Sequence, residues 1–185
     1  MPLTLSQLNG CDIYLLDLIL KGKVHSGMRV LDLGCGHGRN TIALRQLGCD
    51  VWACDPNPQA ISTIAKQYPD LKDRFSVSDI ISMPKDPLGY DLVIVNAVFH
   101  FAPNRENFIS WANAAWSQVR EGGIFFSRLS TTIAWPENAP SCFPFLATED
   151  DLLEREDEWQ AKRTEPLKTT RVEKLRTMTT WILQA

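Results

Sequence analysis

Residues 30–40 read V-L-D-L-G-C-G-H-G-R-N, and this stretch decides the fold. A short apolar run meets a glycine-rich turn, and a helical pattern follows over residues 39–47. Glycine permits positive φ angles and lets a ligand approach the backbone where another residue would place a Cβ atom. The helix beyond the turn begins with unpaired N–H groups that favour a negative group. A turn of this kind binds nucleotides at the carboxyl edge of an open sheet.

The spacing of the glycines distinguishes two classes of nucleotide cofactor. The dinucleotide fingerprint is G-x-G-x-x-G/A, and counted from Gly34 its third small residue falls on Arg39. The glycines instead follow G-x-G-x-G, and Asp32 stands two residues before the first of them. A carboxylate there repels a pyrophosphate but suits the cationic amino group of S-adenosylmethionine. Asp55 follows Gly34 at a spacing that suits a carboxylate accepting ribose hydroxyls in either cofactor class.

Helical and strand patterns alternate on both sides of this turn. The apolar run YDLVIVNA is typical of a strand buried on both faces, and Asn57-Pro58 predicts a helix start. The alternation predicts an α/β fold, with a parallel sheet covered by helices on both faces. We expect strands at 28–34, 49–55, 74–80, 90–97 and 123–129, and helices at 11–21, 39–47, 57–68 and 103–120.

The pattern changes after residue 130. Residues 131–147 are rich in proline and aromatic residues, and we expect a long loop that is a candidate lid. A short helix follows from Thr148, and residues 167–173 and 176–183 predict a terminal antiparallel hairpin. We therefore expect one domain over 1–185. Its parts are an N-terminal helical segment (1–27), a cofactor-binding core (28–130), the loop (131–147), and a helix with the hairpin (148–185).

Composition excludes several classes of protein. The 185 residues have a net charge of −3 and are 44% hydrophobic, which fits a globular domain and argues against a duplex-DNA binder. The nearly apolar stretch at 92–102 is too short to cross a membrane, and the start MPLTLSQLNG does not resemble a signal peptide. Five cysteines without a CxxC pair favour a reduced, cytoplasmic setting. Cys35 and His37 alone are poor zinc spacing, so we expect no metal.

Residues 30–40 resemble the first motif of class I S-adenosylmethionine-dependent methyltransferases, and Gly38-Arg39-Asn40 resembles the tellurite-resistance-type branch. Asp91–Asn96 with the following Val98-Phe99-His100 is similar to the fourth motif of the family, and 120–123 is similar to its PGG turn with Glu in place of Pro. The resemblance implies a Rossmann-like open sheet of seven strands. Their order is 3-2-1-4-5-7-6, with the last strand antiparallel.

The resemblance also implies a set of site residues. We expect S-adenosyl-L-methionine over Gly34 to Gly38, its ribose on Asp55 and its adenine on Asp79 and Ile80. The expected cofactor-binding residues are Asp32, Gly34, Cys35, Gly36, Gly38, Asp55, Pro56, Asp79, Ile80 and Asn96.

Two further residues are catalytic candidates, because each follows or ends a strand at the edge where substrate would meet the methyl group. His100 is interpreted either as a general base near the acceptor or as a residue that anchors the loop. Arg128 is interpreted either as the partner of a carboxylate or oxyanion acceptor, or as part of a surface ion pair. We expect methyl transfer to a small, anionic acceptor, with S-adenosyl-L-homocysteine as product. A non-catalytic adenosylmethionine-binding module and an NAD-dependent oxidoreductase are the alternatives.

Overall fold

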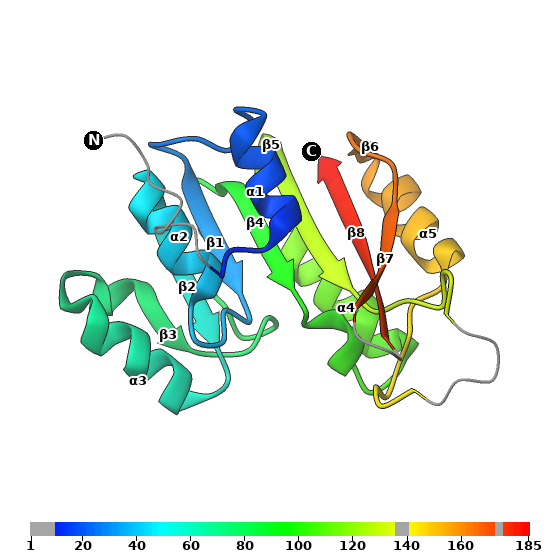
Figure 1. The fold of residues 1–185 in the computed structure, drawn as a ribbon, viewed down its shortest axis with the longest axis horizontal. Helices are drawn as coiled ribbons and strands as arrows, with labels where there is room; N and C mark the ends of the chain where they lie inside the picture. Colours follow the sequence, from blue (N-terminus) through cyan, green and yellow to red (C-terminus); the bar gives the residue numbers. More distant parts are fainter. Residues whose placement is uncertain (1–9, 136–140, 173–175) are drawn as a thin grey trace.

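The computed structural model describes residues 10–135, 141–172 and 176–185, and it is built around a single eight-stranded sheet (Figure 1). In the described ranges no helix is long and apolar enough to cross a membrane. The helices are α1 (Ile13–Leu20), α2 (Arg39–Leu47), α3 (Pro58–Gln67), α4 (Arg105–Trp116) and α5 (Glu149–Trp159), with 3-10 turns at Pro69–Arg74 and Phe99–Phe101. The strands are β1 (Arg29–Leu33), β2 (Asp50–Asp55), β3 (Phe75–Val77), β4 (Tyr90–Asn96), β5 (Val119–Leu129), β6 (Lys162–Arg163), β7 (Lys168–Val172) and β8 (Arg176–Gln184).

The strand order is β3-β2-β1-β4-β5-β8-β6, with β7 also paired to β8. The first five strands are parallel and β8 runs antiparallel to β5, so the expected fold is confirmed. The extra strand arises because β6 and β7 divide the outer edge of β8 between them. The break between them contains Pro166, which has no N–H to donate to the ladder.

Two apolar layers hold the helices to the sheet. On β1, Val30 faces the layer that contains Leu15 and Leu18 of α1, whereas Leu31 faces the layer that contains Phe108 of α4. This alternation follows from the two-residue period of a strand. Helices α1 and α2 therefore cover one face of the sheet, and α4 and α5 cover the other (Figure 1).

Three tryptophans form a stack in the second layer. The rings of Trp116 and Trp159 lie 4.9 Å apart between centroids and are inclined by 6°. Trp159 also stacks on Trp181, at 5.6 Å and 25°. The stack joins α4, α5 and β8, which are distant in sequence.

The expected element boundaries were wrong in two places. The helix expected over 103–120 ends at Trp116, and β5 already begins at Val119, where Val119 pairs with Tyr90. The apolar stripe continued across the boundary because the first residues of a buried strand are as apolar as a helix face. The strand expected over 74–80 covers only Phe75–Val77, since Asp79 lies in a turn where its side chain accepts the N–H of Ser82.

Candidate functional site

The glycine turn between β1 and α2 is held by β2. Gly34 and Cys35 both donate their N–H groups to the carbonyl of Cys54, at 2.8 and 3.0 Å. Gly34, Gly36 and Gly38 all have positive φ angles, of +74°, +55° and +80°. A Cβ atom on Gly34 or Gly38 would lie within 3 Å of Val98 or Ile64, respectively, whereas a Cβ atom on Gly36 would meet nothing within 4 Å. The turn therefore packs tightly at both ends and faces open space at Gly36.

Asp55, at the end of β2, is bound to the same turn. One carboxylate oxygen accepts the N–H of Gly36 at 2.8 Å, and the other accepts the N–H of Asn57 at 2.8 Å. Each carboxylate oxygen has a second lone pair, so both can still accept a hydroxyl. Asp55 thus faces the open side of the turn in a fixed orientation.

A hollow of about 560 Å³ lies over the turn, at the carboxyl edge of the sheet. We call it the glycine-turn hollow. It is lined by Gly34, Cys35, Gly36, His37, Arg39, Asp55, Pro56, Asn96, Ala97, Val98, Phe101 and Trp111. A smaller hollow beside it is lined by Gly34, Pro56, Ser78, Asp79, Ile80, Val98 and Trp111, so the two share a wall.

Asn96 supplies unused hydrogen-bonding capacity to the glycine-turn hollow. The residue is 8% exposed, and neither its amide nitrogen nor its carbonyl oxygen has a partner among the residues described. Buried polar side chains are nearly always satisfied in folded proteins. An amide that both donates and accepts at the wall of a hollow is suited to a ligand with an amino or hydroxyl group.

Asp32 lies beneath the turn rather than in the lining of either hollow. It is 2% exposed and accepts a 2.6 Å hydrogen bond from the hydroxyl of Thr41. Burial raises the pKa of Asp32 to about 6, and the hydrogen bond from Thr41 opposes that shift. Asp32 can therefore influence a ligand in the hollow by the electrostatic field of its charge and not by direct contact.

Two other expected residues differ in their surroundings. Asp79 borders the smaller hollow, and the backbone N–H of Ser82 lowers the pKa of its carboxyl group. Cys35 is buried, and burial raises the pKa of its thiol, so the thiol stays protonated. Cys35 thus contributes a small apolar surface to the lining.

His100 lies outside the lining that the described residues form, and it is 2% exposed. Its Nδ1 accepts the N–H of Ser130 at 3.1 Å, which places the proton of a neutral ring on Nε2. The ring also packs on Phe143, with centroids 4.1 Å apart. These contacts connect the end of β4 to the loop after β5, as the anchoring interpretation requires. Residues 136–140 of the expected lid lie outside the described residues.

Arg128 has an acidic partner from the start of α1. Its Nη1 lies 2.9 Å from Asp12, whose side chain is fully buried, and its Nη2 donates to Thr170. The guanidinium also lies over the ring of Tyr14, at 5.1 Å. Asp12 reaches Arg39 as well, at 3.6 Å, so one carboxylate is shared by two arginines.

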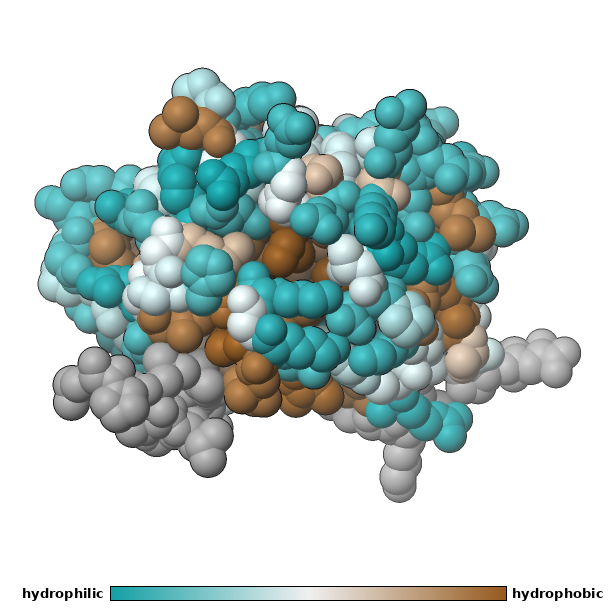
Figure 2. All heavy atoms as spheres, turned by 90° about the horizontal axis from the view of Figure 1, so that it is seen from above, coloured by the Kyte–Doolittle hydropathy of each residue, from teal (hydrophilic) through white to brown (hydrophobic). Residues whose placement is uncertain are grey.

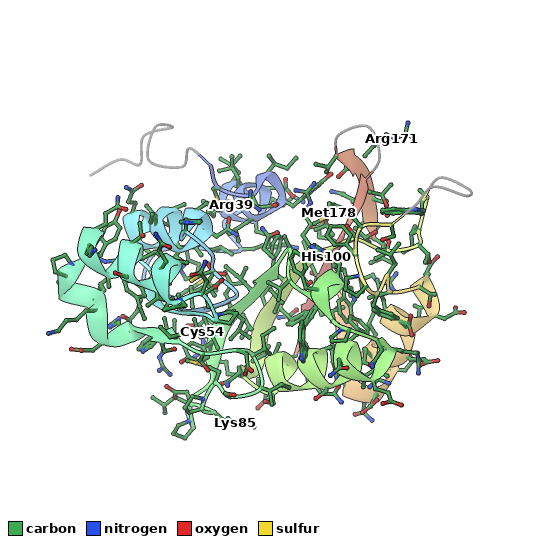
Figure 3. The ribbon with its side chains drawn as sticks, turned by 90° about the horizontal axis from the view of Figure 1, so that it is seen from below. Arg39, Cys54, Lys85, His100, Arg171 and Met178 are labelled. Atoms are coloured by element: carbon green, nitrogen blue, oxygen red, sulfur yellow. The ribbon has the colours of Figure 1, made fainter. Side chains whose placement is uncertain are left out.

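Several lining residues were not expected from the sequence. Figure 3 looks onto this edge and shows Arg39, one of these lining residues, on the side of α2, whereas His100, on the side of β4, lies outside the lining. Trp111 was assigned to the core face of a helix, yet it lines both hollows. Helical periodicity cannot separate a core position from a pocket wall. Ala97 has a positive φ of +62°, and nothing in its residue type predicts that conformation.

A larger hollow, of about 750 Å³, lies at the opposite edge, where β1, β4 and β5 begin. Figure 2 shows this side as mostly hydrophilic with an apolar recess near its centre. Three cationic side chains border the hollow, and each is paired with a carboxylate: Lys23 with Glu165, Arg29 with Asp86, and Arg120 with Asp91. Open parallel sheets bind ligands at the carboxyl edge, so we place the site at the glycine-turn hollow.

The fold and the glycine-turn hollow define a class I methyltransferase domain, for which S-adenosylmethionine is the cofactor. The family model described as "Methyltransferase domain" matches residues 30–123, and the chain belongs to that family. Asp55, the open side of Gly36 and the unpaired amide of Asn96 fit this cofactor, which carries ribose hydroxyls and an amino group.

Particular relatives are similar to the chain over most of its length. It is 31% identical over 150 residues to the "Probable S-adenosyl-L-methionine-dependent methyltransferase TehB" of Haemophilus influenzae. The matched region covers 78% of this chain and 50% of that protein. The crystal structure of TehB from Haemophilus influenzae superposes with a TM-score of 0.71 and 24% identity, over 91% of this chain and 61% of that one. The crystal structure of a magnesium protoporphyrin IX methyltransferase from Synechocystis PCC 6803 with bound SAM superposes with a TM-score of 0.71 and 18% identity. This match covers 94% of this chain and 77% of that one. The chain spans about half the length of the curated relatives it matches.

Proposed function

We propose that the protein transfers the methyl group of S-adenosylmethionine to a small-molecule acceptor in the cytoplasm. The observation that carries this proposal is the pairing of Asp55 with the N–H of Gly36 beside open space at the carboxyl edge. When bound, the cofactor supplies an electrophilic methyl group on a sulfonium. The protein supplies alignment of the acceptor, which contributes several kcal/mol to catalysis in general.

The lining divides into three parts that match the parts of the cofactor. Asp55 would accept the ribose hydroxyls, and Asp79 with Ile80 would hold the adenine in the smaller hollow. Asn96 would bind the amino end of the methionine part, and the buried charge of Asp32 would attract it. Gly34, Cys35, Gly36, Gly38 and Pro56 would provide the close backbone approach.

For the acceptor side, Arg128 and His100 remain our candidates. The Nη1 and Nη2 atoms of Arg128 already bind Asp12 and Thr170, so Arg128 would contact an anionic group through its unpaired Nε. We propose that His100 acts by holding Ser130 and Phe143 in place, since its Nδ1 already accepts a hydrogen bond. A general-base role would require that hydrogen bond to break, and it stays a competing prediction.

Two measurements test the proposal. Calorimetry with S-adenosylhomocysteine and with NADH separates a methyltransferase site from an oxidoreductase site, and we expect binding of the first only. Transfer of labelled methyl groups from S-adenosylmethionine into the small molecules of a lysate then identifies the acceptor. Binding without transfer would support the non-catalytic module, and binding of NADH alone would refute the assignment.

A further inference from the structure

Three polar side chains stand in a row across neighbouring strands. Asn96 on β4 pairs in register with Arg128 on β5, and Arg128 pairs with Thr180 on β8. Residues paired in register project from the same face of a sheet. Two residues earlier on β4 and β5, Ile94 and Phe126 belong to the apolar layer under α1. The row, which we call the Asn96 row, therefore continues that face beneath the start of α1.

Each member of the Asn96 row has a buried polar atom without a partner. These atoms are the amide nitrogen and oxygen of Asn96, the Nε of Arg128 and the hydroxyl oxygen of Thr180. Among the described residues only seven such side-chain atoms occur, and four of the seven belong to this row. Unsatisfied buried polar groups are rare and costly, and a concentration of them on one row calls for a ligand or ordered water.

The unpaired atoms are mainly donors. The amide of Asn96, the Nε–H of Arg128 and the hydroxyl of Thr180 can each donate a hydrogen bond. The charges nearby also favour an anion. Arg39 and Arg128 share the single carboxylate of Asp12, and Lys168 adds a positive charge beside the row, so this group is net positive. Lys168 is part of this group because it pairs in register with Thr180 and lies over the ring of Tyr14.

One end of the row opens to the site. Asn96 lines the glycine-turn hollow, whereas Arg128 and Thr180 extend away from it under Asp12 and Tyr14. Of the row's three residues, Asn96 is the one that lines the hollow, so a ligand in the hollow would meet the row at Asn96. We propose that the donors of the Asn96 row bind a carboxylate of the methyl acceptor, with Thr180 as a substrate-binding residue, while the Asn96 oxygen accepts the amino group of the cofactor. This inference rests on the proposed function.

The chain offers a matched pair of variants for the test. Thr180→Val removes the hydroxyl in the row. Thr177→Val removes another buried, unpaired hydroxyl from the opposite face of the same strand. Deleting an unsatisfied buried hydroxyl should leave stability unchanged or raise it, so both variants should fold. The direct reporter is the ¹H–¹⁵N resonance of the Arg128 Nε–H, assigned by its loss in Arg128→Lys.

The probes are acetate, glycolate, succinate and benzoate, titrated at constant ionic strength into protein saturated with S-adenosylhomocysteine. We expect a saturable shift of the Arg128 Nε–H signal with at least one probe. Thr180→Val should weaken that binding about three- to tenfold, as expected for one lost hydrogen bond, and Thr177→Val should leave it unchanged.

Three outcomes overturn the inference. They are no saturable shift with any probe, equal losses in both threonine variants, or binding that occurs only when 5′-methylthioadenosine replaces S-adenosylhomocysteine. The last would mean that the row holds the carboxylate of the cofactor instead of the acceptor. If S-adenosylhomocysteine itself does not bind, the proposed function fails, and that result is seen before any probe is added.

Discussion

The carboxylate of Asp12 lies 2.9 Å from the guanidinium of Arg128, although 116 residues separate them in sequence. Asp12 also accepts the N–H of Tyr14 and so caps the first turn of α1. Its own N–H is donated to the side chain of Asn40 at the start of α2. One residue thus fixes α1 against α2 and β5, and α1 is the element that covers the Asn96 row.

Asp12→Asn should destabilise the protein by about 3 kcal/mol, because removing one partner of a buried ion pair leaves the other charge uncompensated. Asparagine caps helices as well as aspartate does, so the variant isolates the charge. Urea denaturation measures the difference. Asp17→Asn in the same helix removes an exposed pair with Lys21 and should leave stability near wild type. Similar losses in both variants would contradict the special role of Asp12.

Gly36→Ala should weaken binding of S-adenosylhomocysteine about tenfold or more, because the added methyl group would project into the glycine-turn hollow. Gly22→Ala is the control, since Gly22 also has a positive φ and open space around a Cβ atom. Both variants should lose about 1 kcal/mol of stability from backbone strain. Calorimetry should therefore show a lower affinity for Gly36→Ala than for Gly22→Ala, whereas denaturation should show equal stabilities. Equal affinities in the two variants would place the cofactor elsewhere.

Asp55→Asn should reduce the free energy of S-adenosylhomocysteine binding by about 1.5–3 kcal/mol, the contribution of hydrogen bonds to a charged acceptor. Asp50→Asn, at the opposite end of β2, should bind as wild type does. The measurement is calorimetric titration of protein whose circular dichroism is native. Unchanged affinity in a folded Asp55→Asn protein would show that Asp55 does not bind the ribose.

Asp32 should make stability depend on pH. Its pKa is about 6 in the folded protein, against about 3.9 when unfolded, so between these values the folded state binds a proton that the unfolded state does not. Stability from this group therefore falls as pH rises from about 4 to 6. Asp32→Asn should be more stable than wild type at pH 7, by on the order of 3 kcal/mol, since each pKa unit corresponds to about 1.4 kcal/mol, and equal to it near pH 4. A difference that does not vary with pH would contradict this assignment.

His100→Asn should retain turnover and thermal stability better than His100→Ala, because the asparagine Oδ1 can accept the N–H of Ser130 as Nδ1 does. The comparison needs the acceptor found by labelled transfer. The rate of turnover is measured as a function of pH for both variants. Loss of a limb near neutral pH in both variants would establish the general-base role instead.

The fold was predictable because its signals are local and agree with one another. The glycines at 34, 36 and 38 all adopt positive φ, and the apolar strand at Tyr90–Asn96 lies at the centre of the sheet. The split of the outer strand into β6 and β7 was not predicted. It depends on Pro166, whose effect becomes visible only once the neighbouring strand is known.

The site was predictable only in part. The spacing along the chain predicted Gly36 and Asp55 as neighbours, and the structure brings both to the glycine-turn hollow. The partner of Arg128 was not identified, because Asp12 lies 116 residues away and local patterns carry no information about such contacts. Trp111 was missed for a different reason, since the walls of an apolar hollow and a protein core select the same side chains.

The stacked tryptophans give the protein an optical property. The rings of Trp116 and Trp159 lie 4.9 Å apart between centroids, so their excited states are coupled, and a skew of the two transition dipoles within the stacked planes produces an exciton couplet in circular dichroism. Trp181 extends the stack from β8, which occupies an interior place in the sheet. The couplet therefore reports on the docking of α5 and β8 during refolding, separately from the helical signal.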